Sequence, residues 1–285
     1  MKYLYKFSSI DNNKLKSLSL NKLWFSKLHD LNDPFEGEYV IQSQASDISE
    51  LITAFKGVIY SCGNNFNPEF INFIKKLESL SNEKVTENEL NQSIEILDEF
   101  LDEHVQEAKK VSICSFIQKN DDNEPLLNNL MWSHYADGLR GYCLKYDEDE
   151  LFSTLGTEVN PILTKIMVSY VNAVKTINSI NYFSKNFHES FPGIFLPAKI
   201  AMYRLFSTKS KDWEYENECR LISGKEGLMP YSGKALKEVV FGEKINEKDV
   251  EQLKINAVKA NPNVVFKKAI VKPGTYNIEL VDANS

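Results

Sequence analysis

The sequence predicts an α+β fold: one domain over residues 1–285, with a mixed or antiparallel sheet at its core and helical insertions at about 45–110 and 150–200. Strand-like runs occur near both ends of the chain, as in Tyr3-Leu4-Tyr5-Lys6-Phe7 and Leu236 to Phe241. The stretch from about 47 to 110 is instead polar, with apolar residues at the three- and four-residue steps of amphipathic helices. No internal repeat, low-complexity tract or Gly/Ser linker divides the chain.

The first third of the chain begins with a strand at 3–7 and a short helix that Ser8, Ser9 or Asp11 can cap. A strand is expected at 23–26. A turn should follow at 31–37, because this segment has Asn-Asp before Pro and then a Gly. Helices are expected near 64–75 and over 90–105. The second helix carries an apolar face formed by Leu90, Ile94, Leu97, Leu101 and Val105.

The rest of the chain alternates between strands and helices. A helical turn at 132–136 should end at Gly138, and a helix capped by Asn246 should run to about 260. The crowded run 212–220 favours a strand, although Glu216 and Arg220 also fit an i,i+4 pair on a helix. Further strands are expected at 111–116, 141–146, 166–171, 236–241, 264–266 and 276–280.

Composition limits the class of protein. The chain has 285 residues and a formal net charge of −7, so it offers no broad electrostatic attraction to nucleic acid, although a local basic patch stays open. Without an apolar run of about 18 residues or a signal peptide, a cytoplasmic protein with no membrane association is expected. The scattered Cys62, Cys114, Cys143 and Cys219 lack zinc spacing and are expected to be reduced, mostly buried thiols.

Three clusters carry most of the chemistry that the sequence offers, because each mixes aromatic rings with ionisable groups. They are Asn32-Asp33-Pro34-Phe35-Glu36, Trp132-Ser133-His134-Tyr135 with Arg140, and Trp213-Glu214-Tyr215-Glu216-Asn217-Glu218-Cys219-Arg220. We expect them to converge on one site. The turn at 32–36 has the alternative role of simply closing a loop.

The acidic run is the densest of the three. On a strand, alternation places Glu216, Glu218 and Arg220 on one side and Trp213 and Tyr215 on the other. A carboxylate row beside aromatic rings suits a ribose and a stacked base or nicotinamide. The alternative is a solvated edge strand whose other face packs on the core.

Single residues of the clusters also have alternatives. His134 fits a general base, a structural hydrogen bond or a metal ligand; a metal would also need Asp33, Glu36 or Glu218, and their spacing does not favour one. We therefore expect no metal. Trp132 and Trp213 fit core anchors or stacking surfaces.

The chain resembles a bacterial family catalogued as domain of unknown function 2971. The resemblance rests on LYKF at 4–7, LWFSKLHDLNDPFEG at 23–37, MWSHYADGLRGYCLKYD at 131–147, KSKDWEYENECRLI at 209–222 and EVVFGEKI at 238–245. It spans nearly the whole chain except the helical insertions, and it implies no activity.

The chain also distantly resembles ADP-ribosyltransferase folds, which place a catalytic Glu, often as Glu-x-Glu, on a late strand. Glu216-Asn217-Glu218 matches that motif, and the strand at 236–241 follows it. The resemblance implies NAD as a substrate, with Glu218 or Glu216 stabilising the ribosyl cation. The first strand departs from the pattern, since Tyr5-Lys6 stands where His or Arg is expected, so Lys6 or Arg140 would have to hold the diphosphate.

The leading hypothesis is an ADP-ribosyltransferase-like enzyme acting on NAD or a nucleotide end, as a bacterial toxin or phage-defence effector with a protein or nucleic-acid acceptor. Its predicted catalytic residues are Glu218, Glu216 and His134. Its predicted ligand-binding residues are Tyr5, Lys6, Asn32, Asp33, Phe35, Glu36, Trp132, Ser133, Tyr135, Arg140, Trp213 and Arg220. The alternatives are a metal-dependent nuclease or phosphohydrolase and a non-catalytic nucleotide-sensing or protein-binding module. No GxGxxG, P-loop, GxSxG or HExxH motif occurs.

Overall fold

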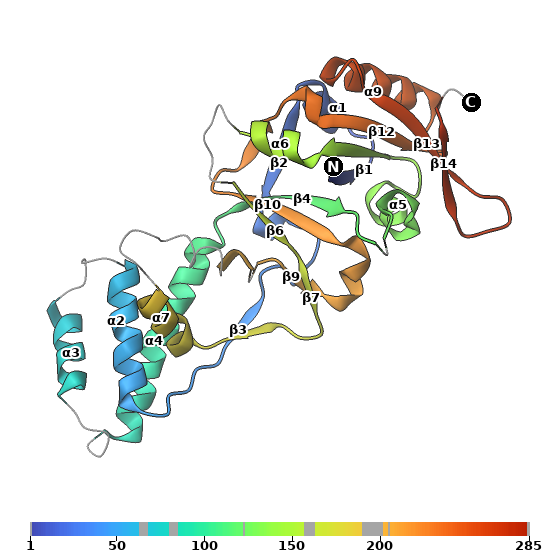
Figure 1. Cartoon of the computed structure of the whole chain (residues 1–285). Helices are drawn as coiled ribbons and strands as arrows, with labels where there is room; N and C mark the ends of the chain where they lie inside the picture. The colour runs from blue at the N-terminus through green and yellow to red at the C-terminus, as the bar shows by residue number, and fades with distance from the viewer. Residues whose placement is uncertain are drawn as a thin grey trace. The chain divides into compact units, whose positions relative to one another are not determined.

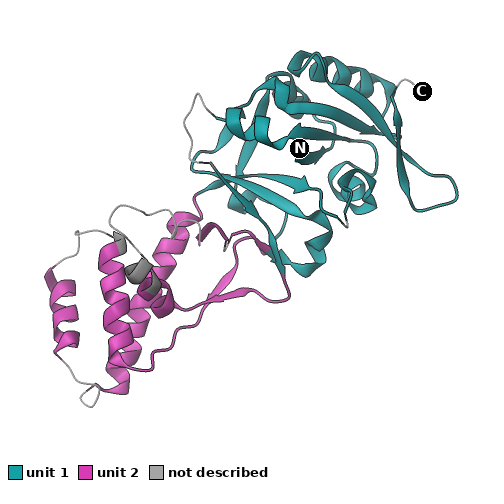
Figure 2. Ribbon diagram, in the orientation of Figure 1, with its two compact units in different colours: residues 1–34, 111–170, 209–285 teal, residues 35–110, 171–208 magenta. Residues whose placement is uncertain are grey.

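The chain divides by contacts into two compact units, coloured separately in Figure 2. The computed structural model describes residues 2–62, 68–79, 85–121, 123–156, 163–189, 202–204 and 206–283. The first unit comprises 1–34, 111–170 and 209–285, and the second comprises 35–110 and 171–208. The sheet of the first unit is therefore assembled from both ends and the middle of the chain (Figure 1).

The first unit starts as the sequence predicts. Its first elements are β1 (Tyr3–Ser8), α1 (Asn12–Ser19) and β2 (Lys22–Lys27). Asp11 caps α1, because its carboxylate accepts hydrogen bonds from the backbone N–H groups of residues 13 and 14 at 2.9 and 3.1 Å. The predicted cap and both strands are confirmed.

Within the described residues, the large sheet has ten strands. Eight of them follow the order β11-β2-β4-β1-β5-β12-β13-β14, and β10 pairs with β4 and β6. The strand bounds are β4 (Ser112–Gln118), β5 (Tyr142–Asp147), β6 (Leu163–Met167), β10 (Glu218–Ser223), β11 (Gly227–Pro230), β12 (Leu236–Gly242), β13 (Val265–Val271) and β14 (Ile278–Asp282). The β12–β13 pair is parallel because α9 (Glu247–Ala260) returns the chain between them, and the other described pairs in this sheet are antiparallel.

Helices cover both faces of this sheet (Figure 1). Helices α1, α9 and α6 (Glu148–Thr154) contribute Leu15, Leu253 and Leu151 to the buried cluster on one face. Helix α5 (Asn129–Tyr135) contributes Met131 and Trp132 to the cluster on the other face. Short 3-10 turns complete the unit at η1 (Leu28–Asp30), η3 (Pro125–Leu127), η4 (Lys211–Glu216) and η5 (Gly233–Ala235). Tyr5, one of the candidate site residues, belongs to the cluster on the α5 side.

The second unit is largely helical, as the periodicity predicts. Its helices are α2 (Ile48–Cys62), α3 (Pro68–Glu78), α4 (Glu87–Ala108) and α7 (Ser179–Glu189), and a small sheet pairs β3 (Tyr39–Ile41) with β8 (Lys175–Ile177). Thr86 and Glu89 form a capping box at the start of α4. Leu97, Leu101 and Val105 of the predicted apolar face are buried.

The α+β fold class is confirmed. Cys114, Cys143 and Cys219 are buried and free, whereas the side chain of Cys62 lies outside the described residues. Among the helices described, none combines the length and the apolar character that crossing a membrane requires.

Candidate active site

The acidic run does not form one continuous strand. Residues Lys211–Glu216 make the 3-10 turn η4, and β10 begins only at Glu218. Ser210 caps the turn, and Asn217 ends it in the left-handed conformation with φ 45°. Asparagine tolerates that conformation better than most residues, and its side-chain amide also donates to the carbonyl of Gln118. The predicted strand over 212–217 is therefore wrong, although 218–220 is a strand.

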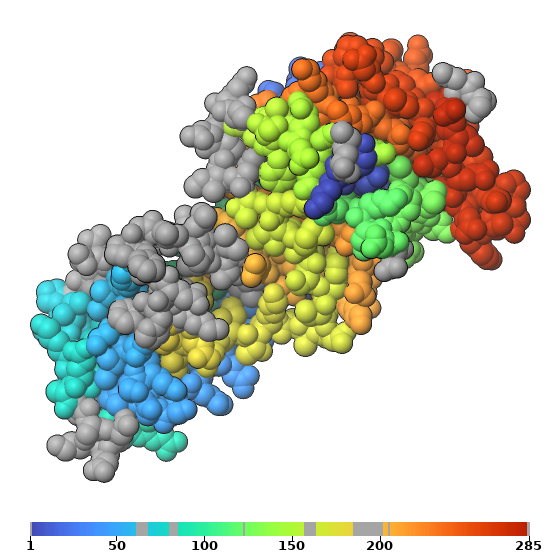
Figure 3. All heavy atoms as spheres, in the orientation of Figure 1, coloured from blue at the N-terminus to red at the C-terminus, as the bar shows by residue number. Residues whose placement is uncertain are grey.

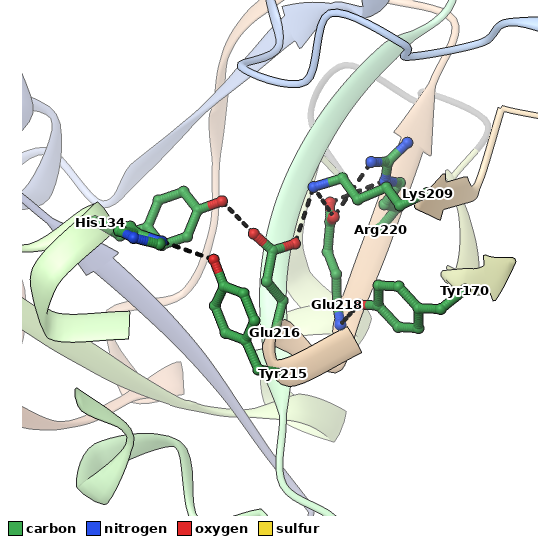
Figure 4. A network of polar contacts seen from close by, with 8 residues as sticks. His134, Tyr170, Lys209, Tyr215, Glu216, Glu218 and Arg220 are labelled. Carbon is green, nitrogen blue, oxygen red and sulfur yellow. Dashed lines mark hydrogen bonds and ion pairs between the residues drawn. The ribbon is translucent and has the colours of Figure 1, made fainter. Parts of the chain in front are cut away.

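Four charged side chains meet at the start of β10 and are almost completely buried: Lys209, Glu216, Glu218 and Arg220. The guanidinium of Arg220 binds both carboxylate oxygens of Glu218, with Nε–Oε1 at 2.8 Å and Nη2–Oε2 at 3.2 Å. The Lys209 ammonium lies 2.7 Å from Glu218 Oε2 and 2.9 Å from Glu216 Oε2. We call these four residues the charge cluster (Figure 4).

Lys209 comes from β9 (Thr208–Ser210), which pairs with β7 (Ser169–Val171). Tyr170 of β7 also reaches the cluster, because its hydroxyl accepts the backbone N–H of Glu218 at 2.7 Å (Figure 4). Sequence reasoning missed both residues. The signals for Lys209 are its place beside the acidic run and at the start of the segment 209–222 that carries the family resemblance.

The two carboxylates of the charge cluster differ in their electrostatics. Burial by itself raises the pKa of Glu218, but Arg220 and Lys209 outweigh burial and lower that pKa to about 2. Burial also raises the pKa of Glu216, and Lys209 and the Tyr135 hydroxyl offset it only in part. Glu218 is thus an ionised partner of Arg220, whereas the charge on Glu216 depends on fewer contacts.

Aromatic rings lie on the Glu216 side of the charge cluster. The hydroxyl of Tyr135 donates to Glu216 Oε1, which joins α5 to η4. The Tyr215 hydroxyl lies 2.7 Å from Nδ1 of His134, and the ring centroids of His134 and Trp213 are 6.3 Å apart. Lys209 Nζ lies 5.6 Å from the centroid of Trp213. We call Tyr135, Trp213, Tyr215 and His134 the aromatic layer.

The aromatic layer is the accessible part of the site. His134 is exposed, and Tyr135, Trp213 and Tyr215 are half-buried. Figure 3 shows the α5 segment, in green, at the surface of the molecule. Glu216 and Lys209, which contact Tyr135 and Trp213 of this layer, are buried.

Other predicted residues near α5 have different positions. Trp132 is buried, packs edge-to-face against Phe7 at 5.1 Å and donates to the carbonyl of Leu126 at 2.8 Å. Trp132 is therefore a core residue that anchors α5 to the sheet, and its ring has no exposed face on which a ligand could stack. Ser133 and Arg140 are exposed, and Arg140 donates to the carbonyl of Asp137 at 3.3 Å.

The two predicted residues of the first strand lie on opposite faces of the sheet. Tyr5 and Glu218 are both register neighbours of Ile117, so Tyr5 shares the Glu218 face. Lys6 projects to the other face, where its ammonium donates to the carbonyl of Ser115 at 2.9 Å. This position does not fit the expectation that Lys6 holds a diphosphate beside Glu218.

The predicted turn is present at 34–37. Asn32 is exposed and Asp33 is buried, both in the first unit, while Phe35 and Glu36 belong to the second. Convergence of this turn on the charge cluster stays a prediction. Among the described residues, no group of three or more His, Cys, Asp or Glu side chains is arranged to hold a metal ion.

Comparison with known protein families gives a match to part of the chain. The family model for "Protein of unknown function (DUF2971)" matches residues 131–221, a stretch that contains the whole charge cluster and the aromatic layer. This match supports the resemblance to that family over these residues, and it names no activity. No curated protein matches the chain, and no solved structure matches it.

Proposed function

We propose that this protein is an ADP-ribosyltransferase-like enzyme that acts on NAD or a related nucleotide, with Glu216 as the carboxylate nearest to the reacting ribose. The observation that carries the proposal is the position of Glu216: it is buried, it is bound by Lys209, and through the Tyr135 hydroxyl it contacts the aromatic layer, whose side chains are exposed or half-buried.

The arrangement suits cleavage of a nicotinamide glycosidic bond. That bond breaks through a ribosyl cation, and a fixed carboxylate stabilises such a cation in other glycosyl transfers. Trp213 and Tyr215 offer ring faces for a base or nicotinamide. His134 is exposed and hydrogen-bonded to Tyr215, a position from which it can exchange a proton with an acceptor.

Glu218 has a different role in this proposal. Both of its oxygens bind Arg220, and one also binds Lys209, so its charge is neutralised inside the protein. Glu218 and Arg220 then form the scaffold that fixes Glu216. The acceptor is water, a protein side chain or a nucleic-acid end, and we expect the enzyme to work in the bacterial cytoplasm as a toxin or phage-defence effector.

The test is to incubate the purified protein with NAD and to measure nicotinamide release by chromatography. Glu216→Gln should lower the release rate at least about 100-fold, since it removes a charge that acts in the transition state. Glu214→Gln is the matched control, because Glu214 lies on the same turn and is exposed. Absence of release from the wild-type protein, or an unchanged rate in Glu216→Gln, would contradict the proposal.

The satisfied charge cluster favours a second candidate, a non-catalytic nucleotide-sensing module. Each of the four carboxylate oxygens of Glu216 and Glu218 accepts a hydrogen bond from another side chain of the protein. In that case NAD or another nucleotide should raise the melting temperature while the ligand stays unchanged. Trp213→Ala should abolish the increase.

A metal-dependent nuclease or phosphohydrolase is the remaining alternative. It would use Asp33, Glu36, His134 and Glu218, but the Glu218 carboxylate is already bound by two cations. Nuclease activity that a chelator abolishes and Mg²⁺ restores would favour this alternative over the transferase.

A further inference from the structure

Lys209 has the most central position in the charge cluster, yet no sequence motif singles it out. Its ammonium contacts both glutamates, at 2.9 Å from Glu216 Oε2 and 2.7 Å from Glu218 Oε2. Its side chain is only 8% exposed. Glu218 is also bound by Arg220, and Glu216 is bound by Lys209.

The surroundings of Glu216 explain why this contact matters. Three tyrosines lie near Glu216: Tyr135 of α5, whose hydroxyl contacts it, the neighbouring Tyr215 of η4, and Tyr170 of β7. The anionic Glu218 of β10 and its partner Arg220 also lie near it. The tyrosines are neutral at physiological pH, and Glu218 is repulsive. A buried carboxylate in such surroundings takes up a proton unless a cation compensates it.

We propose that Lys209 is a positioning residue that keeps Glu216 ionised and oriented inside the protein. Arg220 binds Glu218 on its other side, so Lys209 is shared between the two glutamates, whereas Arg220 provides Glu218 with a second cation. The consequence for activity rests on the proposed function, but the ionisation of Glu216 is testable without it.

The first experiment is a double-mutant cycle on melting temperature. Lys209→Met should lower the melting temperature, because it leaves Glu216 buried without a cation. Adding Glu216→Gln should restore at least half of that loss, since the unpaired charge is then gone. Adding Glu218→Gln to Lys209→Met should give no recovery, because Arg220 would lose its partner. Lys211→Met is the matched control, as Lys211 is exposed at the start of η4.

The pH dependence gives a second readout. In Lys209→Met the folded-state pKa of Glu216 should lie further above its unfolded value, so the folded protein binds the additional proton. Stability from that proton is present at low pH and is lost as pH rises through the folded pKa. The deficit of Lys209→Met relative to the wild type should therefore grow between about pH 5 and pH 8.

The outcomes separate the two proposals. Recovery in Lys209→Met/Glu216→Gln with a pH-dependent deficit supports the role of Lys209. Equal losses in the single and double variants, with no pH dependence, would overturn it and make Lys209 a packing residue. If the wild type releases nicotinamide, the rate of nicotinamide release by Lys209→Met should rise only at a higher pH than that of the wild type. If it does not, the proposed function fails, while the stability cycle still decides the role of Lys209.

Discussion

Glu218 illustrates how residue-scale contacts decide between structure and chemistry. As part of a Glu-x-Glu motif it is a predicted catalytic residue, and its bidentate contact with Arg220 supports the scaffold role that the proposed function gives it. Arg220 is completely buried. A buried guanidinium requires a charged partner, because desolvation of an unpaired ion is strongly unfavourable.

Replacement of Glu218 by Gln should therefore lower the free energy of unfolding by about 3 kcal/mol or more, as expected when one partner of a buried pair is removed. Denaturant unfolding at pH 7 measures it. Glu214→Gln, which changes an exposed residue on the same segment, should stay within about 0.5 kcal/mol. A wild-type midpoint for Glu218→Gln would show that the ion pair contributes nothing net.

The same residue predicts an acid dependence. Its folded pKa of about 2 lies below the usual value near 4.5, so Glu218 stabilises the protein above the unfolded pKa, and that contribution is lost as pH falls through the folded pKa. It amounts to about 3 kcal/mol. Between pH 5 and pH 2 the wild type should lose more stability than Glu218→Gln, and parallel acid titrations of the two would contradict this.

At the scale of elements, the connection from α5 to β5 positions Tyr135 and His134. Asp137, Gly138 and Leu139 have φ values of 48°, 60° and 71°, an unfavourable conformation for the two residues with side chains. Gly242 of β12 packs directly against the backbone of this loop. A Cβ at 242 would lie 2.2 Å from the carbonyl oxygen of Leu139.

Gly242→Ala should consequently destabilise the protein by about 2 kcal/mol or more, because the clash involves backbone atoms that cannot move away cheaply. Gly224→Ala is the matched control, since a Cβ at 224 meets nothing within 4 Å. If the loop positions Tyr135, Gly242→Ala should also impair nicotinamide release. Equal unfolding midpoints for the two variants would refute the close packing.

At the scale of the whole molecule, the two units have separate sets of buried residues. All three tryptophans, Trp24, Trp132 and Trp213, belong to the first unit. The second unit has its own buried side chains, with Leu51, Phe55 and Leu97 among them fully buried. Tryptophan fluorescence therefore reports on the first unit alone.

Leu97→Ala should destabilise the second unit by about 2–5 kcal/mol, because it opens a cavity in the face of α4 that packs inward. Helical circular dichroism should then show an earlier transition, while the fluorescence transition should shift less. The exposed Glu99 provides the control Glu99→Ala on the same helix, with little effect on either signal. Coincident shifts in both signals after Leu97→Ala would mean that the units unfold as one.

The sequence by itself determined most of the elements. The cap at Asp11, the capped helix after Asn246, the apolar face of α4 and the strands at both ends of the chain are local patterns, and the structure contains each of them. It also indicated the importance of segments 131–140 and 212–220, because polar and aromatic residues are concentrated there.

Only the tertiary structure decided which of these residues meet. The contacts from Tyr135 to Glu216 and from His134 to Tyr215 each span 81 residues, and no periodicity encodes such a pairing. The expected strand over 212–220 is interrupted at Asn217, which has a left-handed conformation. The strand register places Lys6 on the opposite face of the sheet from Glu218. The position of Lys209 between two glutamates also follows from folding, and the local sequence shows only a charged run there. Burial requires each of these charges to have a partner, so the tertiary structure determines which charges pair.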